Sequence, residues 1–296
     1  MKKLFTYQRK HLFPHPEATV AVRREFNQVG TAPHNHDFIE LVVVVAGSAL
    51  HRVGRSCHRL GPGGVFVINR RRSHAYEETD GLHIANILIR EDFFERLHPS
   101  IGALPGYHTL FSIGAHSAKA SVFESRTHLD EGTLAKVMTY LDAMEAESLR
   151  PEAGGGALAE AWLMLIIGAV SRCQPSRQAV ATPAATSLGR LLSWLEKDCA
   201  KAISIADMAK VAAMSERTLL RRFRQATGQS PLGYLNGLRL RKARRLLENS
   251  GRASLTNDDV ASRCGFENGN YLARRFRAQF GHAPQAWARI QGRGTG

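Results

Sequence analysis

The first third of the chain carries short apolar runs that alternate with polar residues or are rich in β-branched residues. Gly, Pro, Asn and Asp separate these runs, which read TVAVRREF, FIELVVVVAG, SALHRVG, GGVFVI and LHIANILI and end before about Ile113. Runs of this length and composition predict β-strands. Several such strands in close succession favour a small antiparallel barrel or sandwich. We therefore expect an all-β domain over residues 1–130.

A helical pattern replaces the strand pattern after residue 130. Between Thr133 and Arg150 the apolar residues form one stripe, at Leu134, Val137, Met138, Leu141 and Met144, and this spacing predicts an amphipathic helix. Beyond the break at Gly154–Gly156, a second helix is expected over Leu158–Arg172. Its apolar stretch AWLMLIIGAV is about half as long as a membrane span, which indicates a buried helix. We assign residues 131–173 to this helical segment and expect no membrane partner.

The stretch QPSRQAVATPAATS at residues 174–187 contains two prolines and mostly small residues. This composition is typical of an interdomain linker. The patterns from residue 188 to 291 are helical, beginning with a helix at Leu188–Cys199. A capping residue or a first-turn proline predicts each later helix start, at Ser204, Ser215, Ser230-Pro231, Thr256, Asn268 and Ala283-Pro284. Residues 188–291 are therefore expected to form an all-α domain.

This second domain contains an internal repeat. RTLLRRFRQATGQSP (Arg217–Pro231) and YLARRFRAQFGHAP (Tyr271–Pro284) share six residues at a constant offset of 53, and Tyr234 matches Trp287 at the same offset. Before each of these segments the offset is 52, and Ala209 and Ala213 correspond to Ala261 and Gly265. Small residues four apart before a turn allow two helices to cross closely, as a helix-turn-helix unit requires. The chain is therefore expected to hold two such units.

The second helix of a helix-turn-helix unit enters the major groove of DNA. We expect the following residues to face outward from the two helices: Arg217, Leu220, Arg221 and Arg224 in the first, and Gly269, Asn270, Ala273 and Arg274 in the second. An arginine pairs with guanine, an asparagine with adenine, and an alanine contacts a thymine methyl group. The remaining arginines are expected to contact phosphates or to pack their aliphatic stems, namely Arg222, Arg275 and Arg277.

The charge distribution supports a polyanionic partner for the repeat. The net charge is +14; residues 188–296 carry 20 Lys and Arg against 8 Asp and Glu, which leaves +12 there and +2 in the rest of the chain. Such asymmetry indicates nucleic acid or an anionic membrane surface as the partner.

The four cysteines lie far apart with no Cys-x-x-Cys pair, so a disulfide framework or structural zinc site is not expected and a cytoplasmic location fits.

The segment from about Leu188 to Gln291 resembles the DNA-binding domain of AraC/XylS-type transcription regulators. The resemblance lies in A-x-x-x-A-M-S-x-R-T-L-x-R-R-F-R-x-x-T-G-x-S-P (Ala209–Pro231), R-L-R-K-A-R-R-L-L (Arg239–Leu247) and C-G-F-x-N-x-x-Y-L-x-R-x-F-R-x-x-F-G-x-x-P (Cys264–Pro284). It implies two helix-turn-helix units joined by a long helix, and a contact with RNA polymerase. The Gly269-Asn270 pair departs from the family pattern, so base preference in the second unit does not carry over.

The first domain resembles a cupin. HNHDFIELVVVVAG (His34–Gly47) has the spacing of the first cupin motif, and LGPGGVFVINRRRSH (Leu60–His74) resembles part of the second. In metal cupins the matching positions, here His34, His36, Glu40 and His74, hold a divalent ion. The second motif is broken by NRRRS at Asn69–Ser73, so we favour a ligand-binding or structural role and expect no metal cofactor.

In the resembled family this domain senses a small effector inside the barrel. The candidate lining residues are Arg24, His34, His36, Glu40, His74 and Asn86, whose side chains suit the hydroxyl groups of a sugar. The motifs around these residues resemble the rhamnose-responsive branch. The helices at Thr133–Arg150 and Leu158–Arg172 resemble the family's dimerisation segment, which implies a homodimer, although their apolar stripes fit an intradomain core equally well.

Three functions remain open at this point. The preferred one is a ligand-responsive, sequence-specific transcription regulator without enzymatic activity, and an activator in particular. The second is a metal-dependent cupin enzyme with a DNA-binding appendage, which requires a bound iron, manganese or zinc ion. The third is an architectural DNA-binding protein without a sensor, which predicts little discrimination between sequences.

Overall fold

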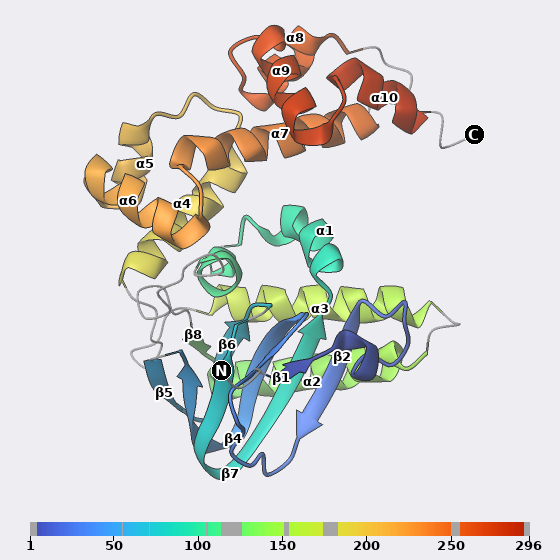
Figure 1. Cartoon of the computed structure of the whole chain (residues 1–296), viewed down its shortest axis with the longest axis vertical. Helices are drawn as coiled ribbons and strands as arrows, with labels where there is room; N and C mark the ends of the chain where they lie inside the picture. Colours follow the sequence, from blue (N-terminus) through green and yellow to red (C-terminus); the bar gives the residue numbers. More distant parts are fainter. Residues whose placement is uncertain are drawn as a thin grey trace. The chain divides into compact units, whose positions relative to one another are not determined.

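The computed structural model describes residues 5–54, 56–70, 72–104, 106–113, 126–150, 154–173, 183–249 and 255–292. The chain separates into two compact units, one formed by residues up to Ser193 and the other by residues from Trp194 onward, with residues 225–227 grouped with the first. Figure 1 labels the elements of both units. The first unit is built on a sheet and the second is helical, as the sequence predicts.

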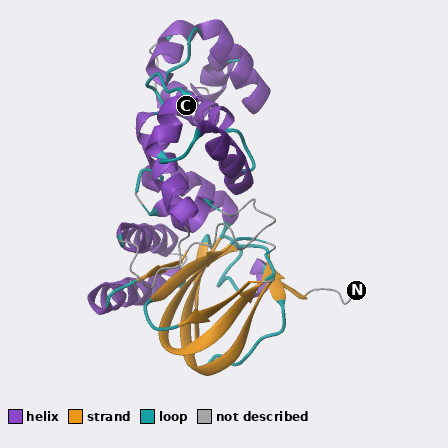
Figure 2. Ribbon diagram, turned by 90° about the vertical axis from the view of Figure 1, so that its left-hand side faces the viewer, coloured by secondary structure: helices purple, strands orange, loops and turns teal. Residues whose placement is uncertain are grey.

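Eight strands in the described part of the first unit form one sheet. They are β1 (Phe5–Tyr7), β2 (Val20–Glu25), β3 (His34–His36), β4 (Ile39–Val53), β5 (Ser56–Leu60), β6 (Gly64–Ile68), β7 (His74–Ile89) and β8 (Arg126–His128). The pairing order is β1-β3-β7-β4-β6-β8, with β2 also on β7 and β5 also on β4. Every pair is antiparallel except β1 with β3. Figure 2 shows how strongly the sheet curves.

The long central strands β4 and β7 bend where the sequence suggested a strand end. The predicted runs FIELVVVVAG and SALHRVG form one strand of 15 residues, whose register with β7 shifts between Val44 and Leu50. Gly47 in this region has a φ of 72°, and a Cβ atom there would lie 2.0 Å from the carbonyl oxygen of Gly81. Glycine therefore marks a bulge with close backbone approach here.

The strands have two different faces because side chains alternate along them. The outer face carries Leu41, Val43 and Ile87, together with apolar residues of the following helices. The inner face carries a separate apolar cluster that includes Val42 and Ile84.

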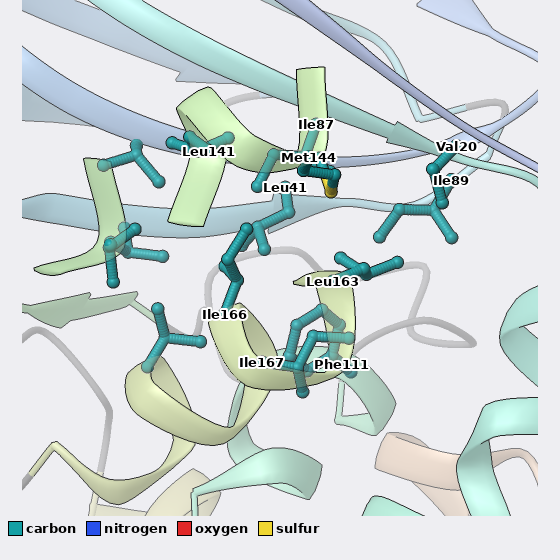
Figure 3. Packing of buried hydrophobic residues seen from close by; sticks show 14 of the residues in the cluster. Val20, Leu41, Ile87, Ile89, Phe111, Leu141, Met144, Leu163, Ile166 and Ile167 are labelled. Carbon is teal, nitrogen blue, oxygen red and sulfur yellow. The ribbon is translucent and has the colours of Figure 1, made fainter. Parts of the chain in front are cut away.

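Two helices cover the outer face. They are α2 (Glu131–Ser148) and α3 (Gly155–Arg172), and Figures 1 and 2 show them side by side along the sheet. Figure 3 shows Leu141 of α2 and Ile166 of α3 packed beside Leu41 of β4. Of the described helices, α3 alone is long and apolar enough to cross a membrane. Its residues Leu163, Ile166, Ile167 and Val170 are buried in this core, as predicted for the stretch AWLMLIIGAV.

A helix in the first unit was not predicted. Residues Glu91–Ile101 form α1, and His108–Ser112 form a short π-helical segment, η2, in a region where only strands were expected. The buried side chains of Phe93, Leu97 and Ile101 are four residues apart, which is a helical spacing. Pro99 inside this segment obscured the pattern, because proline normally ends a helix. A second short turn, η1 (Arg9–His11), follows β1.

The helices beyond residue 182 follow the predicted order. They are α4 (Pro183–Asp198), α5 (Ile205–Val211), α6 (Glu216–Thr227), α7 (Pro231–Asn249), α8 (Asn257–Cys264), α9 (Gly269–Phe280) and α10 (Pro284–Gly292). Helix α4 begins five residues before the predicted Leu188, so the end of the expected linker is helical. The rest of that linker, residues 174–182, lies outside the described residues.

The long helix α7 connects two similar halves of the second unit. In Figure 1 it runs from the α5–α6 pair to the α8–α9 pair. Phe223 of α6 contacts Tyr234 of α7, with ring centroids 5.6 Å apart. In the other half, Phe276 of α9 packs with Leu240 and Leu247 of α7. The apolar residues of α6 and α9 at matching repeat positions, Leu219, Phe223, Leu272 and Phe276, are all fully buried.

Candidate functional site

The two halves of the helical unit begin with the same hydrogen bonds. The Ser204 hydroxyl accepts a bond from the N–H of Asp207 at 3.1 Å, and the Asp207 carboxylate accepts from the N–H of Ser204 at 2.9 Å. Thr256 and Asp259 form the same reciprocal pair, with the same two distances. This capping box occupies two of the donors that a helix start leaves unpaired. The internal repeat therefore extends to the polar groups that position each unit.

The turn inside each unit also repeats. Ala213 and Gly265 occupy equivalent positions, with φ angles of 51° and 83°. Both belong to the left-handed region, which glycine adopts without strain and alanine does not. Ala209 and Ala261 are buried, as close helix crossing requires, but Ala213 is exposed. The second small residue of each copy thus serves the turn rather than the helix crossing.

The first recognition helix, α6, presents a basic outer surface. Ser215 caps its start by accepting a hydrogen bond from the Thr218 N–H at 3.3 Å. Gly228 closes its end in the left-handed conformation. The residues predicted to face outward are all exposed, namely Arg217, Leu220, Arg221 and Arg224, and Arg222 is half-buried. Three guanidinium groups and one leucine therefore lie on the surface available to DNA.

The second recognition helix, α9, presents Asn270, Arg274 and Arg277 on its surface, with Arg275 also exposed and Ala273 half-buried. Asn268 caps this helix by accepting a hydrogen bond from the Tyr271 N–H at 2.8 Å. The Arg274 guanidinium lies 5.4 Å from the centre of the Tyr271 ring. This cation–π contact limits the range of positions that the guanidinium samples.

The prediction that Gly269 faces outward is wrong. Gly269 is buried, and its N–H donates to Oδ1 of Asp258 at 2.7 Å. A Cβ atom at this position would lie 2.7 Å from the same oxygen and 2.8 Å from the carbonyl carbon of Asn257. The first residue of α9 is pressed against α8, so glycine is required there for packing and does not contact bases.

On the inner face of the first unit, three polar side chains converge. They are His36 of β3, Glu40 of β4 and His74 of β7, with exposed fractions of 1%, 7% and 2%. Oε2 of Glu40 lies 3.5 Å from Nε2 of His36 and 3.8 Å from Nε2 of His74. All three atoms are buried without a hydrogen-bond partner. Buried polar groups are normally paired, so this cluster has the character of a binding site.

Burial shapes the protonation of this cluster. Burial opposes ionisation of Glu40, but the neighbouring His36 holds the pKa of its carboxyl group below the ordinary value. Burial lowers the pKa of His74 to about 3, against the attraction of Glu40. Glu40 is therefore a carboxylate and His74 a neutral imidazole at neutral pH.

Two further residues extend the cluster, and neither of them was predicted. Nδ1 of His74 lies 3.2 Å from Nε2 of His51, and Nδ1 of His51 lies 3.1 Å from Nη2 of Arg126. His51 is 1% exposed, and burial, followed by the charge of Arg126, lowers its pKa well below the ordinary value. The bulges of β4 set the register that places His51 beside His74, and β8 brings Arg126 from a distant part of the chain.

The remaining predicted effector residues fall in different places. His34 lies beside His74, with ring centroids 4.3 Å apart, and its Nδ1 donates to the carbonyl of Ala32 at 2.9 Å. Asn86 pairs with Val42 across β4 and β7, and its buried Oδ1 has no hydrogen-bond partner. Both residues are close enough in the sheet to take part in a site around Glu40.

The prediction that Arg24 lines the inner face is wrong. Its Nε donates to Glu145 at 2.8 Å and its Nη2 to Asp142 at 2.6 Å, both on α2. In the sheet register Arg24 pairs with Ala85 of the outer-face core, whereas Arg23 pairs with Asn86. The alternation of β2 is therefore shifted by one residue from the prediction, and Arg24 anchors α2 to the sheet.

Comparison with known proteins places both units among regulators. Residues 18–138 match the family described as AraC-like ligand binding domain, and residues 208–290 match a helix-turn-helix domain family. The chain is 32% identical over 273 residues to the HTH-type transcriptional activator RhaS of Escherichia fergusonii, with 92% of this chain and 93% of that protein covered. It is 31% identical over 269 residues to RhaS of Klebsiella pneumoniae, with 90% and 91% covered.

Two solved structures are also similar. The DNA-binding domain of AdpA in complex with a target DNA is 33% identical, with 37% of this chain and 96% of that chain covered and a TM-score of 0.34. ToxT from Vibrio cholerae is 12% identical, with 92% and 97% covered and a TM-score of 0.35.

Proposed function

The chain belongs to the AraC/XylS family of transcription regulators, with a helix-turn-helix DNA-binding domain and an AraC-like ligand-binding domain, and from that premise we propose that it activates a promoter in response to a sugar. Its identity with the RhaS activators along most of both chains agrees with the rhamnose-responsive branch expected from its motifs. The observation that carries the proposal is the pair of identically capped helix-turn-helix units with exposed arginines in one basic region.

At the promoter, the two recognition helices enter two successive segments of the major groove on one side of the DNA. Arg217 and Arg221 are positioned by α6 to pair with guanine, and Asn270 on α9 suits adenine. The half-buried Ala273 offers a methyl group to thymine, and the exposed Arg274 follows it on α9. Arg222 and Arg277 contact phosphates, which strengthens binding without reading the sequence.

The effector binds on the inner face of the first unit. Glu40, His36 and His74 supply buried polar atoms without partners, and His34 and Asn86 lie beside them. A sugar offers several hydroxyl groups that both donate and accept, which satisfies such groups at little desolvation cost. L-Rhamnose is the first probe to test. Coupling of this site to DNA binding requires a differential free energy of roughly 1–3 kcal/mol.

A homodimer is the working form in this proposal. Leu158, Met164 and Leu165 of α3 are among the exposed large apolar residues of the described chain. A second copy of the same helix buries such a stripe in an isologous contact. RNA polymerase is the further partner of an activator, and the protein acts without catalysis in the cytoplasm.

One experiment tests the function as a whole. The full-length chain is offered a pool of randomised DNA duplexes, with and without L-rhamnose. We expect one enriched sequence and an affinity for it that rises with the sugar. Glu40→Gln should keep the enriched sequence and lose the response. Enrichment of no sequence would exclude a promoter-specific regulator and favour the architectural alternative.

A further inference from the structure

The cluster around Glu40 satisfies a distance test for a metal site, since one ligand atom from each of His36, Glu40 and His74 lies within 4.8 Å of the others. A histidine that binds a metal must offer a lone pair, with its proton on the other ring nitrogen. The hydrogen bonds made by the Nδ1 atoms of His36 and His74 therefore decide whether a metal fits.

The hydrogen bonds that lead from Arg126 through His51 to His74 run in one direction. Arginine has N–H donors and no acceptor, so Nδ1 of His51 accepts from Nη2 of Arg126 over 3.1 Å. A neutral imidazole has one N–H, so the proton of His51 sits on Nε2 and is donated to Nδ1 of His74 over 3.2 Å. Nδ1 of His74 is thereby an acceptor, and the proton of neutral His74 sits on Nε2, which faces Glu40 at 3.8 Å.

The opposite arrangement is unfavourable. A bare Nε2 on His74 requires a proton on its Nδ1, donated to Nε2 of His51. The proton of neutral His51 would then sit on Nδ1 and face the N–H of Arg126. Two donors 3.1 Å apart in a buried site would each lose a hydrogen bond, and unpaired buried donors are costly.

His36 carries a proton on its other ring nitrogen. Its Nδ1 lies 2.7 Å from the carbonyl oxygen of Phe38, which only accepts, so Nδ1 is a donor. Its Nε2 lies 3.5 Å from the carboxylate of Glu40. The cluster thus offers the Glu40 carboxylate as an acceptor and the N–H of His74 as a donor.

We propose that Arg126 and His51 are positioning residues that hold His74 as a hydrogen-bond donor, so that the cluster takes neighbouring hydroxyl groups of an uncharged polyol and not a divalent metal ion. A hydroxyl donates to Glu40 and accepts from His74, whereas an ammonium group only donates and a carboxylate only accepts. A metal ion meets the N–H of His74 instead of the lone pair that this nitrogen would have to supply. The identity of the ligand rests on the proposed effector site; the proton position does not.

The first test measures the proton positions in the unmodified protein. Long-range ¹H–¹⁵N correlation spectra of the full-length ¹⁵N-labelled chain distinguish the two neutral tautomers of each histidine, and His74→Asn identifies the His74 signals by their loss. We expect the proton on Nε2 for His74 and on Nδ1 for His36. A proton on Nδ1 of His74 overturns the proposal.

The second test creates the metal site. Arg126→Met removes the donor, which frees His51 to carry its proton on Nδ1 and His74 to offer a bare Nε2. We expect this variant to bind one equivalent of Co²⁺ with visible d–d absorption, about 10- to 100-fold more tightly than the unmodified chain, the usual size of outer-shell effects. The gain should disappear in the double variants with Glu40→Gln or His74→Asn.

Arg59→Met is the matched control, because it removes the same charge from an exposed position on β5. It should bind Co²⁺ no better than the unmodified chain. If Arg126→Met folds and binds Co²⁺ no more tightly than the unmodified chain, the proposal is overturned. Neither test uses DNA or sugar, so failure of the proposed function, seen in the DNA selection, is separable from failure of this inference.

Discussion

Exchanging alanine and glycine in the turns of the two helix-turn-helix units should change the free energy of unfolding in opposite directions. Ala213 and Gly265 hold equivalent positions with positive φ. A non-glycine residue in this conformation costs roughly 1–2 kcal/mol, and replacing alanine by glycine loses about 0.4–1 kcal/mol through the greater freedom of the unfolded chain. Ala213→Gly should therefore raise the free energy of unfolding of the helical unit by about 0.5–1 kcal/mol.

Gly265→Ala should act in the other direction and more strongly. It adds the left-handed cost, and its Cβ would lie 2.6 Å from the carbonyl oxygen and 2.8 Å from the carbonyl carbon of Ala200. Displacing backbone to relieve such an overlap costs about 1–3 kcal/mol. After the unfolded-state term is subtracted, the expected loss is about 2–4 kcal/mol.

The assay is urea unfolding of the full-length chain in a Trp162→Phe background. The remaining tryptophans, Trp194 and Trp287, both belong to the helical unit, so their fluorescence reports on it. Equal losses in Ala213→Gly and Gly265→Ala, or a neutral Gly265→Ala, would refute the structural equivalence of the two turns.

Four further predictions concern the sites. Arg221→Ala and Arg274→Ala should each weaken binding to the selected DNA by about 1–3 kcal/mol in fluorescence anisotropy, whereas an unchanged affinity in both would remove these residues from the interface. Glu40→Gln should leave DNA affinity without sugar intact and abolish the response to sugar; an unchanged dose–response curve would place the effector elsewhere. Because burial lowers the pKa of His74 to about 3 from an ordinary value near 6.5, the unfolded chain takes up its proton first, so stability is lost as the pH falls from about 6.5 towards 3. His74→Asn should flatten that part of the stability–pH curve, and an unaltered slope would contradict the neutral buried state. Leu165→Asp should shift the protein from dimer to monomer in analytical ultracentrifugation, and a dimer that persists would locate the contact elsewhere.

The helical unit could be predicted nearly completely from the sequence because its signals are local. Caps such as Ser204 and Thr256 act on backbone groups three residues away, and Gly228 ends α6 in the left-handed conformation. The repeat also supplies each signal twice. Gly269 was the exception, since its burial depends on the contact with Asp258 eleven residues earlier.

The sheet could be predicted in kind but not in register. The alternation of β2 did not reveal which of Arg23 and Arg24 faces inward, because both are polar and the shift of one residue is decided by pairing with β7. His51 and Arg126 were missed for the same reason. Their approach to His74 depends on bulges in β4 and on a strand more than fifty residues farther along, and local sequence carries no signal for either.

The most direct test of two tandem recognition helices on DNA is a missing-base interference footprint of the full-length chain on its selected duplex. Two interference segments on one side of the helix, with centres about 10–10.5 base pairs apart, are predicted. Arg221→Ala should erase sensitivity only in one segment and Arg274→Ala only in the other. A single segment, or simultaneous loss of both in either variant, would contradict independent reading by α6 and α9.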